Sequence, residues 1–303
     1  MAGKVVKAIG GLIVLGVIGA GAFLYITRPQ PMPDSYWAQA GTPDVKNGEL
    51  VFSMAGCVSC HKAPDAKPGQ ELTLSGGLAL NSPFGTFHAP NISPDDNAGI
   101  GKWTLAEFGN ALTRGVGPNG SHLYPALPYG SYIRMTPKDV GDLFAYIKTL
   151  PKSSNVAPPH DLSFPFNIRL LLGGWKFLYL NDQPRIQMAT ADEQVKRGQY
   201  IVEGPGHCGE CHTPRDQFGG FKANMWLAGA PNPEGKGKIP DITPGGPSAS
   251  WSEDDIAGYL ENGLTPEFDS VGGSMVEVQK NMAKLPKEDR AAIAAYLKVI
   301  PKR

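Results

Sequence analysis

All four cysteines of this 303-residue chain lie in two pentapeptides of the same pattern. "CVSCH" runs from Cys57 to His61, and "CGECH" runs from Cys208 to His212. In each, two thiols are separated by two residues and followed at once by a histidine. This pattern constrains the chain more than any other feature, because thiols and imidazoles at fixed spacing serve metal, redox or covalent-cofactor chemistry.

The two pentapeptides belong to a longer internal repeat. Four pairs of segments resemble each other at offsets of 150, 150, 148 and 150 residues. The pairs are "NGELVFSMAGCVSCHKAP" with "RGQYIVEGPGHCGECHTP", "HAPNISPD" with "KIPDITPG", "WTLAEFGNALTRG" with "WSEDDIAGYLENG", and "KDVGDLFAYIKTLPK" with "EDRAAIAAYLKVIPK". Similarity at one offset over four separate blocks predicts two tandem units.

Each unit is expected to contain the same helices. A short helix leads into the pentapeptide, a second helix begins after Thr104 or Ser252 as N-cap, and a last helix ends before Pro151 or Pro301. No segment has a convincing strand pattern, so the predicted fold is all-α, with long loops. The predicted segments are a membrane anchor at 1–27, a Pro-rich linker at 28–43, a first domain at 44–152, an apolar connector at 153–190 and a second domain at 191–303.

Three chemistries use cysteine pairs of this kind. A zinc site would need thiolates from two different repeats and would leave both histidines unused. A thioredoxin-like disulfide sits in a βαβ pattern, which the sequence lacks. Covalent haem uses every element, because two thiols add to the two vinyl groups of one haem and the next histidine lies below the iron.

The sequence therefore predicts two covalently bound haem c groups. An apolar macrocycle would also give a core to a chain with 38 glycines and 28 prolines. The predicted attachment residues are Cys57, Cys60, Cys208 and Cys211, and the predicted proximal iron ligands are His61 and His212.

The sixth iron ligand differs between the two units. Met275 lies in "VGGSMVEV", in a predicted loop before the last helix, and is expected opposite the second proximal histidine. The same offset in the first unit falls on 125–127, where no side chain binds iron. Met135 is the only methionine after the first pentapeptide in that unit and is the predicted ligand. His122 or an open position are the alternatives.

The N-terminal segment has no charge from Ala8 to Thr27. A helix of this length spans a bilayer core of about 30 Å. Lys4 and Lys7 precede it, which predicts a single-pass anchor in a bacterial inner membrane with both haem domains on the periplasmic side. A signal peptide cleaved near 20–22 and a buried soluble helix are the alternatives, but the apolar run continues through Ile26.

The connector contains a strongly apolar stretch, "LSFPFNIRLLLGGWKFLYL", in which only Arg169 and Lys176 are charged. Pro165 and the Gly173–Gly174 pair argue against a membrane span. The favoured interpretation is a segment packed across both units, and the alternative is an interfacial patch that contacts lipid or a partner. Lys and Arg equal Asp and Glu at 28 each, so no nucleic-acid partner is expected.

A family resemblance rests on these motifs. The motifs that carry the resemblance are "APNISPD", "HLYPALPYGSY" and "DLFAYIKTLP" after the first pentapeptide, and "SVGGSM" and "AAIAAYLK" after the second. The chain resembles membrane-anchored di-haem c-type cytochromes with two class-I-like domains. It is similar to the cytochrome c subunits of bacterial alcohol and aldehyde dehydrogenases. Those relatives often carry Met where this chain has Leu127 and usually carry three haem domains, so the chain departs from them at both points.

The resemblance implies a periplasmic electron carrier without substrate chemistry of its own. The implied partners are a dehydrogenase subunit or other donor, and a quinone pool, terminal oxidase or soluble cytochrome as acceptor. A His/Met iron is coordinatively saturated, which suits electron transfer. The alternative function is a di-haem peroxidase or thiosulfate dehydrogenase that uses an open position on the first haem. A role mainly in assembling a larger oxidoreductase complex is compatible with electron transfer.

Overall fold

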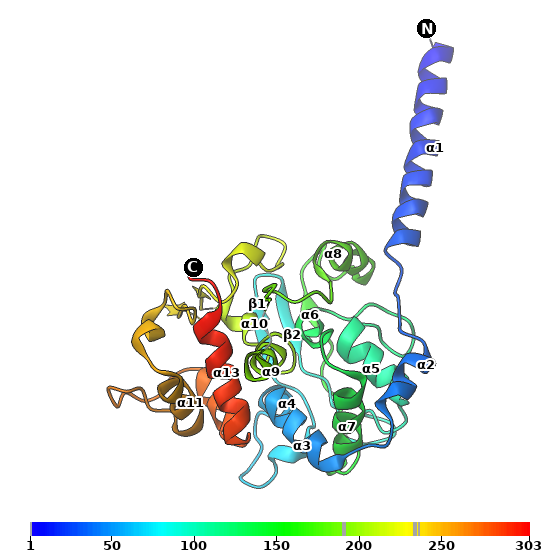
Figure 1. The fold of residues 1–303 in the computed structure, drawn as a ribbon. Helices are drawn as coiled ribbons and strands as arrows, with labels where there is room; N and C mark the ends of the chain where they lie inside the picture. Colours follow the sequence, from blue (N-terminus) through cyan, green and yellow to red (C-terminus); the bar gives the residue numbers. More distant parts are fainter. Residues whose placement is uncertain (1, 190–191, 233–234, 236) are drawn as a thin grey trace.

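The computed structural model is mostly helical and describes residues 2–189, 192–232, 235 and 237–303 (Figure 1). Two predicted boundaries lie outside these residues: the start of the anchor at residue 1, and the junction of connector and second domain at 190 and 191.

The helices are α1 Ala2–Ile26, α2 Asp34–Trp37, α3 Val45–Met54, α4 Cys57–His61, α5 Leu105–Arg114, α6 Tyr129–Tyr132, α7 Pro137–Ile147, α8 Leu172–Tyr179, α9 Glu193–Glu203, α10 Gly209–His212, α11 Glu253–Asn262, α12 Met275–Met282 and α13 Lys287–Val299. Short 3-10 helices are η1 Ala38–Ala40, η2 Glu71–Thr73, η3 Arg169–Leu171, η4 Ala223–Met225 and η5 Pro247–Ser250. The strands are β1 Ala79–Ser82, β2 Gly85–His88, β3 Asp161–Leu162, β4 Ala230–Pro231 and β5 Lys238–Ile239.

The helix starts follow the local sequence signals. Thr104 and Ser252 each form a capping box, with Glu107 and Asp255 respectively, at the starts of α5 and α11. Each box satisfies backbone N–H groups that the first helical turn leaves without partners. The predicted N-caps of these two helices are therefore confirmed.

The expectation of a fold without strands is wrong in detail. β1 and β2 form an antiparallel hairpin, and β3 from the connector pairs with β2. β4 and β5 form a second antiparallel pair. These strands have two to four residues, which is too short for an alternating pattern to be visible in the sequence.

Two helix crossings organise the globular part. α3 packs against α7, and α9 packs against α13. A Cβ on Gly48 would overlap the carbonyl oxygen of Asp142, and a Cβ on Gly198 would overlap that of Ala292. Glycine is therefore needed at both crossings because the backbones approach too closely for any side chain.

Each crossing has its own apolar core. One cluster, with Leu143 and Ile147 at its centre, joins α3 to α7, and the other, with Ile201 and Trp226, joins α9 to α13. Met54, the last residue of α3, packs into the second cluster and is only 2% exposed. The two sets of helices are thus packed against each other.

The first helix, α1, projects from the globular part as a separate rod (Figure 1). Residues Gly3–Ile26 are long and apolar enough to cross a membrane, and none of that window is buried. A membrane anchor and a signal sequence both have this length and composition.

Replacing Gly198 by alanine would place a methyl group against the Ala292 carbonyl and push α9 away from α13. We expect a loss of about 1–3 kcal/mol in the free energy of unfolding, as in other overpacked cores. Gly258 on α11 has nothing within 4 Å of its Cβ position, so Gly258→Ala is the matched control. That control should be neutral or should stabilise by up to about 1 kcal/mol.

Denaturant unfolding of the full-length protein in detergent, followed by circular dichroism, measures both variants. An unchanged midpoint for Gly198→Ala would contradict a crossing in which the two backbones touch.

Candidate cofactor-attachment sites

The two pentapeptides occupy equivalent places in the fold. α3 ends at Met54 and α4 begins at Cys57, and Gly56 between them has a positive φ of 57°. α9 likewise ends shortly before α10, and His207, with φ of 40°, takes the turn. Each pentapeptide is thereby fixed at the end of one helix of a crossing pair.

The two histidines are held in the same way. His61 Nδ1 lies 2.8 Å from the carbonyl oxygen of Pro90, and His212 Nδ1 lies 2.8 Å from that of Pro240. Because a carbonyl only accepts, Nδ1 carries the proton and the Nε2 lone pair remains for a metal. The sequence shows Pro90 and Pro240 in its "APNISPD" and "IPDITPG" repeat, but gives them no partner.

Backbone hydrogen bonds close a loop around each histidine. Gly76 N donates to His61 O at 2.7 Å, and Gly229 N donates to His212 O at 2.8 Å. Leu74 and Leu227 have positive φ values of 47° and 60° and are fully buried. A positive φ is costly for leucine, so each loop holds a strained residue that sequence reasoning missed.

Burial favours the neutral forms of Cys57, Cys208 and both histidines. Burial, then the neighbouring Cys60, raises the pKa of the Cys57 thiol to about 12. Burial, then Cys211, does the same for Cys208. Burial also lowers the pKa of His61 and His212, against the effect of their carbonyl partners. A neutral imidazole is the form that binds a metal.

The predicted sixth ligands lie in different environments. Met135 is buried, 3% exposed, in the core of the first helix pair. Met275 packs against the core of the second pair. The prediction that Met275 lies in a loop is wrong: it is the first residue of α12, because Met275, Val278 and Met282 recur at helical spacing on that core.

Two further observations concern sixth ligation. His122 Nε2 lies 3.1 Å from the carbonyl oxygen of Thr27, so this ring is engaged at the base of α1. Met135 N donates to Tyr132 O, and Leu285 N donates to Met282 O. Met135 therefore occupies the position in the first unit that Leu285 occupies in the second, and Tyr132 likewise matches Met282. The assignment of Met135 and Met275 to iron stays a prediction.

The two attachment segments contact each other. The carbonyl oxygen of Ala55 accepts hydrogen bonds from Tyr132 Oη at 3.1 Å and from His207 Nε2 at 3.2 Å. The rings of Tyr132 and His207 meet edge to face, with centroids 5.5 Å apart. Asn281 on α12 donates to Ser59 Oγ, inside the first pentapeptide, at 2.9 Å.

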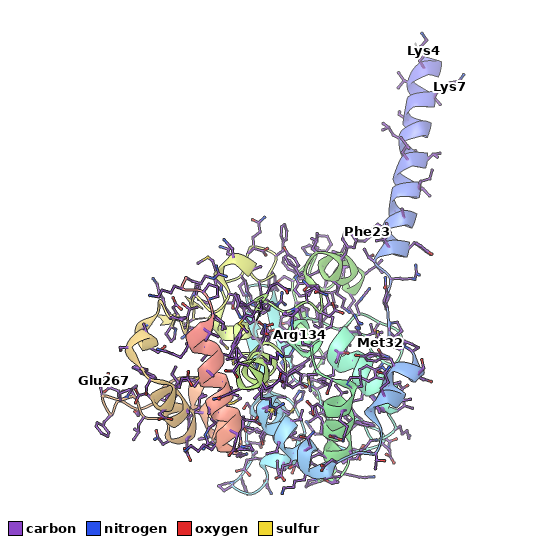
Figure 2. The ribbon with its side chains drawn as sticks, in the orientation of Figure 1. Lys4, Lys7, Phe23, Met32, Arg134 and Glu267 are labelled. Atoms are coloured by element: carbon purple, nitrogen blue, oxygen red, sulfur yellow. The ribbon has the colours of Figure 1, made fainter. Side chains whose placement is uncertain are left out.

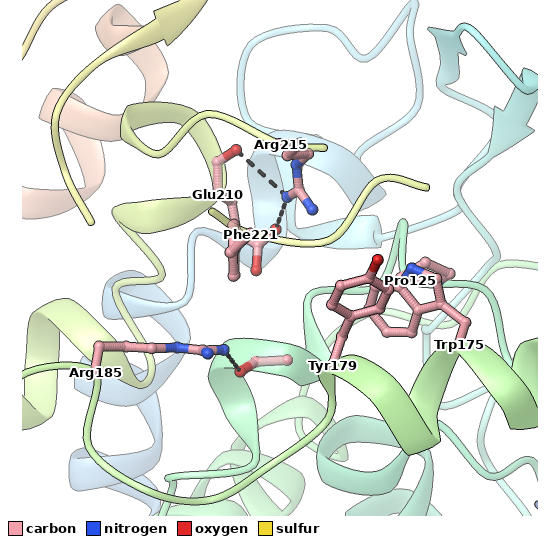
Figure 3. A pocket seen from close by; sticks show the side chains of 8 residues that line it. Pro125, Trp175, Tyr179, Arg185, Glu210, Arg215 and Phe221 are labelled. Carbon is pink, nitrogen blue, oxygen red and sulfur yellow. Dashed lines mark hydrogen bonds and ion pairs between the residues drawn. The ribbon is translucent and has the colours of Figure 1, made fainter. Parts of the chain in front are cut away.

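A small pocket lies beside the second pentapeptide (Figure 3). Glu210, within "CGECH", pairs with Arg215 and accepts from Ser131 Oγ at 2.9 Å. Arg185 donates to the carbonyl oxygen of Gly130 at 3.0 Å. The hydrogen bond between Ser131 and Glu210 therefore connects the second pentapeptide to α6 of the first helix set.

Comparisons with known proteins identify the family. The cytochrome c profile matches residues 45–151. A "Diheme cytochrome c-type" protein of Cereibacter sphaeroides is 50% identical over 291 residues, covering 96% of this chain and 97% of that protein. The chain belongs to the cytochrome c family.

Other relatives are larger proteins. The fructose dehydrogenase cytochrome subunit of Gluconobacter japonicus is 36% identical over 95% of this chain. The cytochrome c subunit of the quinone alcohol dehydrogenase of Gluconobacter oxydans is 35% identical over 85% of it. The chain spans 58% and 55% of the lengths of these two relatives, respectively.

As a cytochrome c similar to a di-haem protein, the chain carries covalently bound haem c in two copies. The donor set fits that cofactor. Cys57, Cys60 and Cys208 form no disulfide, and each pentapeptide presents an imidazole whose Nδ1 already binds a backbone carbonyl. The contact of His61 Nδ1 with the Pro90 carbonyl is repeated by His212 and Pro240, so the chain has two equivalent sites.

We expect the double variant Cys208→Ala with Cys211→Ala to lose one haem and to keep the other, because each thiol pair serves one cofactor. Intact-mass spectrometry of protein matured with a competent haem-ligation system measures this as a decrease of one haem. Ser59→Ala, inside the other pentapeptide, is the control and should keep both. A double variant that still carries two haems would refute the assignment of Cys208 and Cys211.

Proposed function

We propose that this protein is a periplasmic, membrane-anchored di-haem cytochrome c that relays electrons from a dehydrogenase or other donor to a respiratory acceptor. Its two tandem cytochrome c domains are 44–152 and 191–303, joined by the connector 153–190. The haem irons supply one-electron redox chemistry, so two of them hold the two electrons that a dehydrogenase removes from its substrate.

The observation that carries the proposal is the direct contact between the two attachment segments. Ala55, two residues before Cys57, and His207, next to Cys208, share a hydrogen bond. Asn281 and Ser59 share another. Both cofactors would therefore be bound by segments in van der Waals and hydrogen-bond contact, which suits transfer within one chain.

The relatives support the choice of donor. The fructose and alcohol dehydrogenase relatives are named as cytochrome subunits of dehydrogenases. A gluconate 2-dehydrogenase cytochrome c subunit of Pantoea cypripedii is 33% identical over 86% of this chain. We infer that this chain likewise accepts electrons from a dehydrogenase subunit, through a small and transient or subunit-like contact.

The proposed iron ligands are His61 and Met135 in the first domain, and His212 and Met275 in the second. With one histidine and one methionine bound, each iron would be coordinatively saturated and would leave no site for peroxide or thiosulfate. This assignment separates the electron-carrier function from the enzymatic alternative, which needs an open position on the first iron.

Met135→Leu should convert one haem from low spin to high spin and leave the other unchanged, because leucine offers no lone pair. Near-infrared magnetic circular dichroism and electron paramagnetic resonance identify the axial ligands of each haem. Met225→Leu, at an exposed methionine on η4, is the control and should change neither.

A Met135→Leu spectrum identical to wild type would assign the first sixth ligand elsewhere. A high-spin haem already present in wild type, together with peroxide or thiosulfate turnover, would favour the enzyme.

A further inference from the structure

The connector exposes apolar side chains on η3 and α8. Phe177 is 69% exposed, Leu178 68%, Leu170 53% and Leu171 46%. We call these four residues the connector patch. Single exposed apolar residues are common on soluble proteins, but four within nine positions are a local concentration of the kind that marks a contact surface.

The two charged side chains of the apolar stretch 162–180 donate hydrogen bonds to the backbone of the first helix set. Lys176 Nζ donates to the carbonyl oxygens of Arg114 at 2.9 Å and Gly115 at 2.6 Å. Arg169 donates to the carbonyl oxygen of His122 at 3.1 Å. A helix on a water-exposed surface has the opposite arrangement, with its apolar side inward.

The connector also touches the last turn of α1. A Cβ on Gly173 would overlap Thr27, and a Cβ on Gly174 would lie 3.1 Å from the ring of Phe23. Figure 1 shows α8 beside the base of α1, and Figure 2 places the labelled Phe23 there. His122 fixes the same base through Thr27.

The length of α1 indicates how deep in a bilayer the contact between α8 and α1 would lie. A helix of 25 residues is about 38 Å long, longer than a hydrocarbon core of about 30 Å. If Lys4 and Lys7 lie at the far surface, then Phe23 and Thr27 lie at the near one. In that placement α8 would lie at the depth of the lipid headgroups.

We propose that the connector patch is a monotopic membrane-binding surface that lies in the headgroup and acyl boundary next to α1. This rests on the proposed membrane anchor. Two attachments, the span and the patch, would fix how the haem domains are oriented relative to the bilayer. An apolar face of this kind enters the boundary by about 5–10 Å.

The test uses full-length, haem-loaded protein in vesicles of phosphatidylethanolamine and phosphatidylglycerol. The vesicles contain a lipid with a photoactivatable diazirine near the glycerol backbone. After irradiation and proteolysis, mass spectrometry maps the labelled peptides. We expect label on α1 and on 164–180. We expect none on 264–270, where Phe268 is 83% exposed. Its neighbour Glu267 lies on the side of the globular part away from α1 (Figure 2).

A matched pair of variants sharpens the result. Phe177→Gln with Leu178→Gln should lower the label on the connector peptide by about fivefold, because polar side chains leave the acyl boundary. Phe268→Gln should leave it unchanged. Haem content per chain verifies that both variants are folded.

Label on α1 without label on the connector overturns the proposal while keeping the anchor, and cross-linked dimers in that sample would assign the patch to a second copy. Label on the connector without label on α1 supports the patch and contradicts the anchor of the proposed function. Absence of label from both contradicts both.

Discussion

The close helix contacts at Gly48 and Gly198 position the two attachment pentapeptides. Gly48 lets α3 touch the backbone of α7, and Gly198 lets α9 touch that of α13. Each attachment pentapeptide follows directly from α3 or α9, so the crossing fixes its position relative to the last helix of its set. A loop-rich chain gains a rigid frame from two close contacts, and the long loops between them are free to surround a cofactor.

The two attachment segments are held in contact with each other by residues from both sets of helices. Met54, the end of α3, is buried in the second core, and the next turn places the Ala55 carbonyl against Tyr132 and His207. The side chain between the second pair of thiols, Glu210, reaches back to Ser131. Neither attachment segment is surrounded by its own helices alone, because each set of helices contributes contacts to the other's site.

The sequence predicted the features that depend on neighbouring residues. The capping boxes at Thr104 and Ser252 need only three residues, and the thiol–thiol–histidine pattern only five, so both could be read directly. The hydrogen bond from His61 to Pro90 joins residues 29 positions apart, and no local signal fixes such a partner. The repeat at "APNISPD" marked the segment without revealing its contact.

Other features escaped prediction for physical reasons. The β1–β2 hairpin is stabilised by the connector strand β3 from a distant part of the chain, which a local pattern cannot show. Met275 appeared to lie in a glycine-rich loop, but packing on the second core extends a helix back to it. His122 had the chemistry of an iron ligand, yet the structure places its ring on Thr27 at the base of α1.

The proposed electron relay runs between the two haems of one chain across the Ala55–His207 contact. Pulse radiolysis of the purified full-length protein injects a single electron and follows its redistribution between the haems. Transfer within one chain should give an equilibration rate that is independent of protein concentration. A rate proportional to protein concentration would contradict it, because the electron would then move between molecules.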